Sequence, residues 1–212
     1  VVDEEGGGNG SLSATLHGYN ADAAVICEPT DCNITTANMG FVFFSVKVTG
    51  VSLHSGMKWL GVNAIEKAIF LMGALDELEQ RWGEKYHHPE LPSPSINVGV
   101  IQGGTAGSAV PGSCEFKLCL HYIPGLMEHE AVCQEVVRAI MERAGQDKWL
   151  RENPPELVIY QQGGGFEIDR RSPFVQCVRR AAEKGMGWAN LNVAATGNDA
   201  RYYQHIAGIP TV

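Results

Sequence analysis

The hydrophobic pattern is most regular in the central part of the chain. Apolar and β-branched residues fill four segments of strand length, while two longer segments repeat apolar side chains every three to four positions, as amphipathic helices do. In chain order the expected elements are a strand at residues 41–48, a helix at 62–82, strands at 95–102 and 113–122, a helix at 127–144 and a strand at 157–160. The order strand, helix, strand, strand, helix, strand predicts a ferredoxin-like two-layer domain.

The flanking parts of the chain follow a different pattern. Short apolar runs, such as residues 23–27, alternate there with glycine and Asx turns, which is typical of a mostly parallel α/β sheet with functional loops at its strand ends. A helix is expected at residues 172–184. Residues 1–38 and 163–212 are therefore expected to form one α/β domain, interrupted by the ferredoxin-like domain at residues 39–162.

Composition and charge narrow the classes of function. The 212 residues carry a net charge of -8 with scattered Lys and Arg, so the chain lacks the basic surface that nucleic-acid binding requires. No apolar run approaches the roughly 20 residues needed to cross a bilayer, so neither nucleic acid nor a membrane is expected as a partner. The six cysteines show no C-x-x-C or zinc-finger spacing, which favours a reduced, cytoplasmic protein.

Two groups of carboxylates follow short apolar runs and are candidates for chemistry. Glu4 and Glu5 precede three glycines, and Glu28 comes directly after the run at residues 23–27. A β-α-β unit would place two such strand ends side by side. Metal-assisted hydrolysis needs a hard oxygen ligand for the metal and a nearby base for the metal-bound water. Neighbouring side chains at a strand end point in different directions, so one carboxylate could bind the metal while the other acts as the base. A solvated turn is the alternative interpretation of either motif taken alone.

Four motifs, in order along the chain, resemble those of one enzyme superfamily. They are Asp3-Glu4-Glu5-Gly6, Cys27-Glu28-Pro29-Thr30, a glycine-framed His54 followed by Gly61-x-Asn63-Ala64, and Gln102-Gly103-Gly104 with Val110-Pro111-Gly112. Over essentially its whole length the chain resembles the zinc-dependent superfamily of acetylornithine deacetylase, succinyl-diaminopimelate desuccinylase and glutamate carboxypeptidase. The resemblance implies an α/β fold, with a partial catalytic domain of the zinc-peptidase type and an inserted lid, or dimerisation, domain.

The resemblance also assigns roles to individual residues. It implies that Glu4 is the general base and that Glu5 and Glu28 are metal ligands. It further implies that two zinc ions, replaceable by cobalt or manganese, bind in a complete site. His54 matches the lid histidine that reaches across a dimer to help stabilise the oxyanion.

A substrate site is implied in the same way. Asn198 and Arg201 belong to a segment that resembles the family's late substrate loop, where the guanidinium would pair with a substrate carboxylate; a surface arginine is the alternative. Ser108 stands where relatives often have asparagine, and His121 stands where many have arginine. Because both positions are associated with substrate contacts, these departures argue against succinyl-diaminopimelate as the substrate.

These observations predict a metal-dependent amide hydrolase that removes the acyl group of an N-acyl amino acid or a similar small carboxylate. A metallo-carboxypeptidase or dipeptidase of the same superfamily, which would take a peptide substrate, and a non-catalytic dimerisation module are the alternatives. A homodimer is expected through the inserted domain, because an exposed edge of the strand at residues 41–48 would pair with a second copy. None of the seven histidines forms a His-x-Asp motif, so the chain is expected to be an excerpt that is inactive alone.

Overall fold

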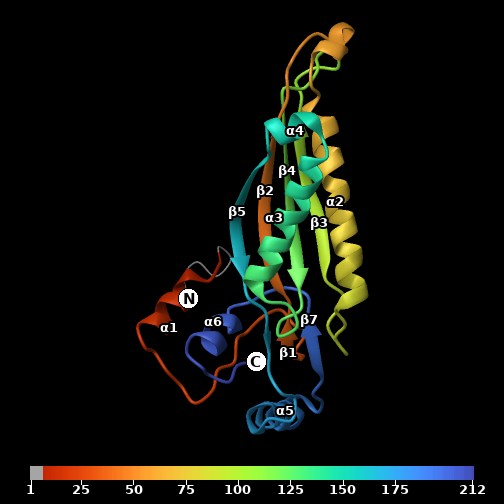
Figure 1. Ribbon diagram of the computed structural model, residues 1–212. Helices are drawn as coiled ribbons and strands as arrows, with labels where there is room; N and C mark the ends of the chain where they lie inside the picture. Colours follow the sequence, from red (N-terminus) through yellow and green to blue (C-terminus); the bar gives the residue numbers. More distant parts are fainter. Residues whose placement is uncertain (1–6) are drawn as a thin grey trace.

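Two β-sheets organise the protein in the computed structural model, which describes residues 7–212 (Figure 1). The larger sheet has four antiparallel strands in the order β3-β4-β2-β5, and the helices α2 and α3 pack on it. Its elements are β2 (Gly40–Thr49), the 3₁₀ helix η1 (Ser55–Leu60), α2 (Ala64–Lys85), β3 (Ser95–Gly103), β4 (Ser113–Tyr122), α3 (His129–Gly145), α4 (Lys148–Glu152) and β5 (Glu156–Gly163). The predicted ferredoxin-like order is confirmed, with η1 and α4 as additions that the sequence pattern did not predict.

The position of β2 corrects the predicted mode of dimer formation. The strand lies inside the sheet, because β4 pairs with one of its edges and β5 with the other. Its edges are therefore not available to a second copy, and the prediction based on residues 41–48 is wrong in this respect. The edge strands of the sheet are β3 and β5.

Helix α2 begins and packs as its sequence dictates. The side chain of Asn63 caps its first turn by accepting hydrogen bonds from the backbone N–H groups of Ile65 and Glu66. Side chains that recur every three to four positions are buried against the sheet and α3: Ala64, Ala68, Leu71, Leu75, Leu78 and Trp82. Ile69 was expected on this apolar face, but it is 58% exposed. The helix therefore also presents an apolar side chain to the outside.

The smaller sheet contains three short strands in the order β6-β1-β7. Strands β1 and β7 run parallel, and β6 pairs with β1 in the antiparallel sense. The elements around it are α1 (Asn9–Leu16), β1 (Ile34–Asn38), β6 (Phe166–Glu167), α5 (Pro173–Met186), β7 (Leu191–Ala194) and α6 (Ala200–His205). The expected strand at residues 23–27 is reduced to an isolated parallel bridge between Ala24 and Thr211.

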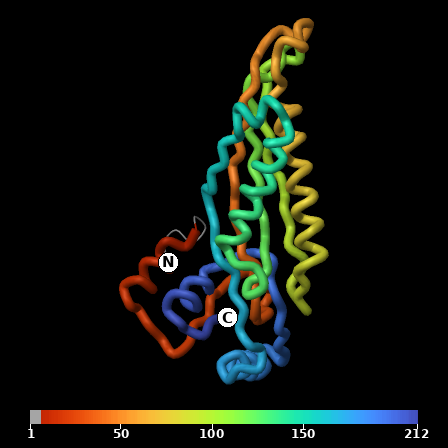
Figure 2. The backbone as a smooth tube through the Cα atoms, viewed as in Figure 1, coloured from red at the N-terminus to blue at the C-terminus, as the bar shows by residue number. Residues whose placement is uncertain are grey.

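Two short linkers connect the two sheets. Met39 alone separates β1 from β2, so the larger sheet extends away from the smaller one as a long arm (Figures 1 and 2). The chain returns through Gly163 and Gly165, and a Cβ atom on Gly165 would lie 2.4 Å from the carbonyl oxygen of Asn38. The outgoing and returning strands are thus in close backbone contact at the junction. Within residues 7–212 no helix is both long enough and apolar enough to cross a membrane.

Candidate active site

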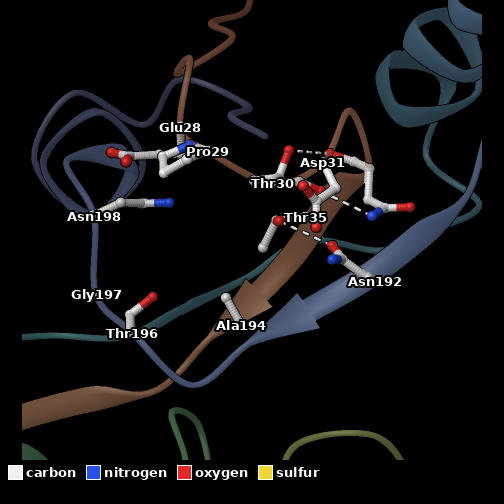
Figure 3. Close-up of a pocket in the computed structure, with 11 residues that line it drawn as sticks. Glu28, Pro29, Thr30, Asp31, Thr35, Asn192, Ala194, Thr196, Gly197 and Asn198 are labelled. Atoms are coloured by element: carbon white, nitrogen blue, oxygen red, sulfur yellow. Dashed lines mark hydrogen bonds between the residues drawn. The ribbon is translucent and has the colours of Figure 1, made fainter.

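A polar cavity of about 280 Å³ lies where the loop before β1 meets the loop after β7. Glu28, Thr30 and Asp31 line it from the first loop, and Thr196 and Asn198 from the second. Figure 3 shows Glu28 and Asn198 on the same side of this space, with the nitrogen of Asn198 directed into it and the carboxylate of Glu28 pointing away from the other labelled side chains. The structure therefore brings together one predicted metal ligand and one predicted substrate-binding residue.

The loop that carries Glu28 is fixed by its own hydrogen bonds. The Thr30 hydroxyl donates to the carbonyl oxygen of Asn33 at 2.7 Å, and the Asn33 side chain donates back to the carbonyl oxygen of Thr30 at 2.8 Å. Asp31 and Cys32 adopt left-handed conformations, with φ angles of 52° and 59°. Such conformations are unfavourable for residues with a side chain and persist where the surroundings hold them. Glu28 thus projects from a loop with a defined shape.

Two cavity residues come from strands that sequence reasoning did not identify as functional. Thr35 on β1 donates a hydrogen bond to the Asn192 side chain on β7 at 2.9 Å, as Figure 3 shows. The pair forms the cavity wall on the side of the parallel strands. A polar residue within a strand-like segment could have marked each of them as a candidate site residue. Nothing in the sequence, however, indicates that Thr35 and Asn192 are hydrogen-bond partners.

The predicted residues Glu4 and Glu5 lie outside the described residues. Glu28 is a carboxylate, which is the type of oxygen ligand that zinc accepts. Across residues 7–212, however, no three His, Cys, Asp or Glu side chains come close enough to hold a metal ion. The described residues therefore fit one ligand position of a zinc site and do not complete it.

Arg201 is buried next to this cavity, with 6% of its surface exposed. One terminal nitrogen of its guanidinium donates to the carbonyl oxygen of Asn198 at 2.8 Å, and the other donates to that of Gly7 at 3.0 Å. The charged group lies over the rings of Phe41 and Tyr202, at 5.5 and 4.5 Å from their centroids. The surface-arginine alternative is wrong, because this side chain is enclosed by the protein.

His54 lies between β2 and η1, and Ser108 lies between β3 and β4. These two connecting segments are at the tip of the larger sheet, at the end opposite the smaller sheet (Figure 1). The two segments are joined by a bridge between His54 and Ala109 and by a hydrogen bond of 2.8 Å from the Ser55 amide to the Ser108 carbonyl oxygen. The Nδ1 atom of His54 accepts a hydrogen bond from the Gly56 amide, and its side chain is exposed. The structure thus brings these two predicted residues together and places them away from Glu28.

His121 lies on β4, at the base of the larger sheet and on the face opposite the helices. Burial lowers the pKa of its imidazole, which favours the neutral form. The Sγ atom of Cys119 is 4.0 Å from its Nε2 atom, and burial raises the pKa of that thiol to about 11. In place of a permanently charged arginine, this position carries a ring that burial keeps neutral.

Comparison with known proteins places these features in a family. Residues 36–148 match the family described as "Peptidase dimerisation domain". The chain is 29% identical to the N-formyl-4-amino-5-aminomethyl-2-methylpyrimidine deformylase of Halalkalibacterium halodurans, covering 100% of this chain and 54% of that protein. It is 32% identical to the acetylornithine deacetylase of Vibrio cholerae, covering 78% of this chain and 43% of that enzyme.

Among solved structures, human carnosine dipeptidase 1 has a similar fold. The TM-score is 0.71 at 17% sequence identity, and the match covers 99% of this chain and 57% of the other. The chain therefore spans about half the length of the proteins it matches.

Proposed function

The chain belongs to the peptidase dimerisation domain family within the zinc-dependent peptidase and deacylase superfamily, and on this basis we propose that its full-length gene product is a metal-dependent amide hydrolase. The observation that carries the proposal is the polar cavity at Glu28, which lies between two loops of the smaller sheet. A carboxylate residue, Glu28, and an amide residue, Asn198, both line this cavity. Such a pair offers an oxygen ligand for a metal and a hydrogen-bond donor for a substrate.

We propose that Glu28 and Glu5 hold the metal and that Glu4 acts as the base. Bound zinc would polarise the amide carbonyl group and lower the pKa of a bound water. Asn198 is suited to orient the substrate, because its Oδ1 atom accepts a hydrogen bond from the Ala200 amide while its nitrogen is directed into the cavity. Two zinc ions, with cobalt or manganese as substitutes, and a cytoplasmic location are part of the same proposal.

The preferred reaction is removal of a small acyl group from an amine. The two relatives cited by sequence are named as a deformylase and a deacetylase, whereas the dipeptidase shares the fold at low identity. An N-acyl amino acid or a similar small carboxylate is therefore the proposed substrate class. His121 stands where many relatives have arginine, and this departure is our reason for not proposing succinyl-diaminopimelate as the substrate.

A homodimer would bring His54 to such a site. The strand β3 forms one edge of the larger sheet, and its residues Val100 and Ile101 are 40% and 49% exposed. Exposed Ile69 lies on α2, which packs against this strand. An unpaired strand edge beside an apolar helix surface favours pairing with a second copy around a two-fold axis. We propose this surface as the interface, with residues 39–162 as the lid and dimerisation unit and Ser108 beside His54 at its tip.

A deacylase screen tests the proposed function. Full-length protein supplied with zinc or cobalt is incubated with N-formyl, N-acetyl and N-succinyl amides and with dipeptides, and the released amine is quantified. The expected result is amine release from the formyl or acetyl substrates, lost in Glu28→Ala. Metal-loaded protein that releases amine from none of them would leave the dimerisation module as the better interpretation.

A further inference from the structure

Two neighbouring residues of α6 bind one backbone atom from the start of the described chain. Arg201 donates to the carbonyl oxygen of Gly7 at 3.0 Å, and the Tyr202 hydroxyl donates to the same oxygen at 2.6 Å. The Arg201 guanidinium is also 3.2 Å from the Tyr202 hydroxyl, so the three groups form a closed triangle. These residues lie more than 190 positions apart in the sequence, at separations of 194 and 195.

The contact is too close to be incidental. Gly8 has a left-handed conformation with φ of 73°, and a Cβ atom built there would lie 2.0 Å from the Asp199 carboxylate and 2.7 Å from the Tyr202 ring. Only glycine fits such a position without strain. The segment at Gly7 and Gly8 is therefore seated directly against the residues that begin α6.

The groups that make the contact are themselves held rigidly. Arg201 is 6% exposed and is enclosed between the rings of Phe41 and Tyr202. Asp199 is 3% exposed and lies 3.9 Å from the guanidinium. A buried guanidinium with bonds to two carbonyl oxygens has little freedom to turn toward a ligand.

Gly7 follows Glu5 by two residues and Glu4 by three. Fixing the Gly7 carbonyl group therefore restricts where both carboxylates are found. The same guanidinium packs on Phe41, the second residue of β2, so it also connects this segment to the base of the larger sheet.

We propose that Arg201 and Tyr202 are positioning residues that hold the segment of Glu4 and Glu5 through the Gly7 carbonyl group, and that Arg201 does not bind the substrate carboxylate itself. This inference rests on the proposed function for its catalytic consequence, but the contact with Gly7 is independent of it. Two groups of experiments therefore separate the two ideas.

The first experiment measures the contact without any substrate. Amide hydrogen exchange is followed by mass spectrometry in peptides that cover residues 7–12 of full-length Arg201→Met and Tyr202→Phe proteins. Exchange in these peptides should become faster while peptides from α2 and β3 keep their wild-type rates. The matched control is Arg171→Met, because the Arg171 side chain is 93% exposed and lies outside the proposed site. Unchanged exchange in residues 7–12 of both variants would overturn the proposal.

The second experiment separates positioning from substrate binding. Each variant is assayed on an N-acyl amino acid and on the same compound with its carboxylate converted to an amide. Misplacement of a catalytic group by 1 Å costs about 100-fold in rate, so Arg201→Met should lower kcat by a factor between about 10 and 100 on both substrates, with little change in KM. Tyr202→Phe keeps the ring over the guanidinium and should show a smaller decrease of the same kind.

The opposite result has a distinct signature. If Arg201 pairs with the substrate carboxylate, Arg201→Met raises KM for the acid and leaves the amide unaffected, which would refute the positioning role. A wild-type protein that hydrolyses neither compound would remove the proposed function, and the exchange experiment would still decide whether Arg201 and Tyr202 hold Gly7.

Discussion

Heterodimers built from two single variants test whether His54 serves the site of its own chain or that of a second copy. The structure argues for the second copy. Strand β2 has ten residues, and at roughly 3.3 Å per residue it separates its two ends by about 30 Å. His54 follows one end of β2, whereas the other end is preceded by β1, whose residue Thr35 lines the cavity at Glu28. No side chain spans that distance.

The perturbations are His54→Ala and Glu28→Ala, placed either on different chains or on the same chain. Co-expression with two affinity tags isolates the heterodimers. With the variants on different chains, a histidine acting in trans leaves one of two sites intact, and the heterodimer should retain about half of the wild-type activity. With both variants on one chain and a wild-type partner, neither site is complete.

The magnitudes make the two arrangements easy to distinguish. Loss of one group that stabilises an oxyanion lowers kcat by about 100- to 1,000-fold, so the incomplete site contributes nothing measurable beside an intact one. The His54 side chain makes one local hydrogen bond, to the Gly56 amide, so its removal should cost about 1 kcal/mol of stability or less. If the same-chain arrangement keeps half of the activity and the different-chain arrangement is inactive, the trans role of His54 is refuted.

Three further predictions concern stability and reactivity. Trp82→Phe removes the 2.6 Å hydrogen bond from the indole to Glu135 and should lower the free energy of unfolding by about 1.5 to 3 kcal/mol; an unchanged urea midpoint would contradict this. Gly165→Ala should destabilise the folded protein by about 1 to 3 kcal/mol, because the added Cβ atom would clash with backbone atoms. Gly83→Ala should stabilise it by about 0.5 to 1 kcal/mol, because Gly83 lies inside α2 and a Cβ atom there would have no atom within 4 Å. Thermal unfolding of both variants and the wild type measures the difference. Because burial raises the pKa of Cys119 from 9.0 to about 11, its alkylation rate, followed by peptide mapping, should keep rising between pH 9 and pH 11, and a plateau near pH 9 would contradict the effect of burial.

The larger sheet could be predicted because its elements are long and its apolar residues have a regular period. Strand β4 shows this most clearly, since its buried residues alternate with partly exposed ones along ten positions. Helix α2 repeats buried residues over 22 positions. Periodic signals of that length are rarely produced by other structures. The exposure of Ile69 could not be predicted, because periodicity alone does not show which apolar residues are left for a further partner.

The smaller sheet could not be predicted in the same detail because its strands are short and polar. All five residues of β1 are buried, although three of them are Thr35, Thr36 and Asn38. Tertiary hydrogen bonds make this possible: Thr36 donates to the carbonyl oxygen of Asn192, and the Asn38 side chain accepts from the Phe166 amide. Those partners lie more than 120 residues away in sequence, at separations of 156 and 128, so no local pattern reveals the strand.

At the candidate site, too, the sequence identifies individual residues but does not show which groups they contact. The resemblance singles out Glu28 and Asn198 as candidate site residues, and both line one cavity in the structure. The sequence does not show that Arg201 meets Gly7, because that contact joins the two ends of the chain. Residue type indicates what a side chain is able to do, while the fold determines which group it reaches.

Helix α6 extends this argument to the whole molecule. It has six residues, fewer than the roughly 12 at which an isolated helix becomes even marginally stable, so its contacts must hold it in place. Besides the bonds to Gly7, Tyr203 donates to Ser11 in α1, Gln204 donates to the carbonyl oxygen of Glu167 in β6, and His205 lies 2.7 Å from the carbonyl oxygen of Gly165. This short helix thus contacts the first described residues, the smaller sheet and the junction of the two sheets. The core of the larger sheet is formed by its own strands and helices together with Ala37 and Met39 at the junction, whereas the Gly7 carbonyl group is held by side chains of α6.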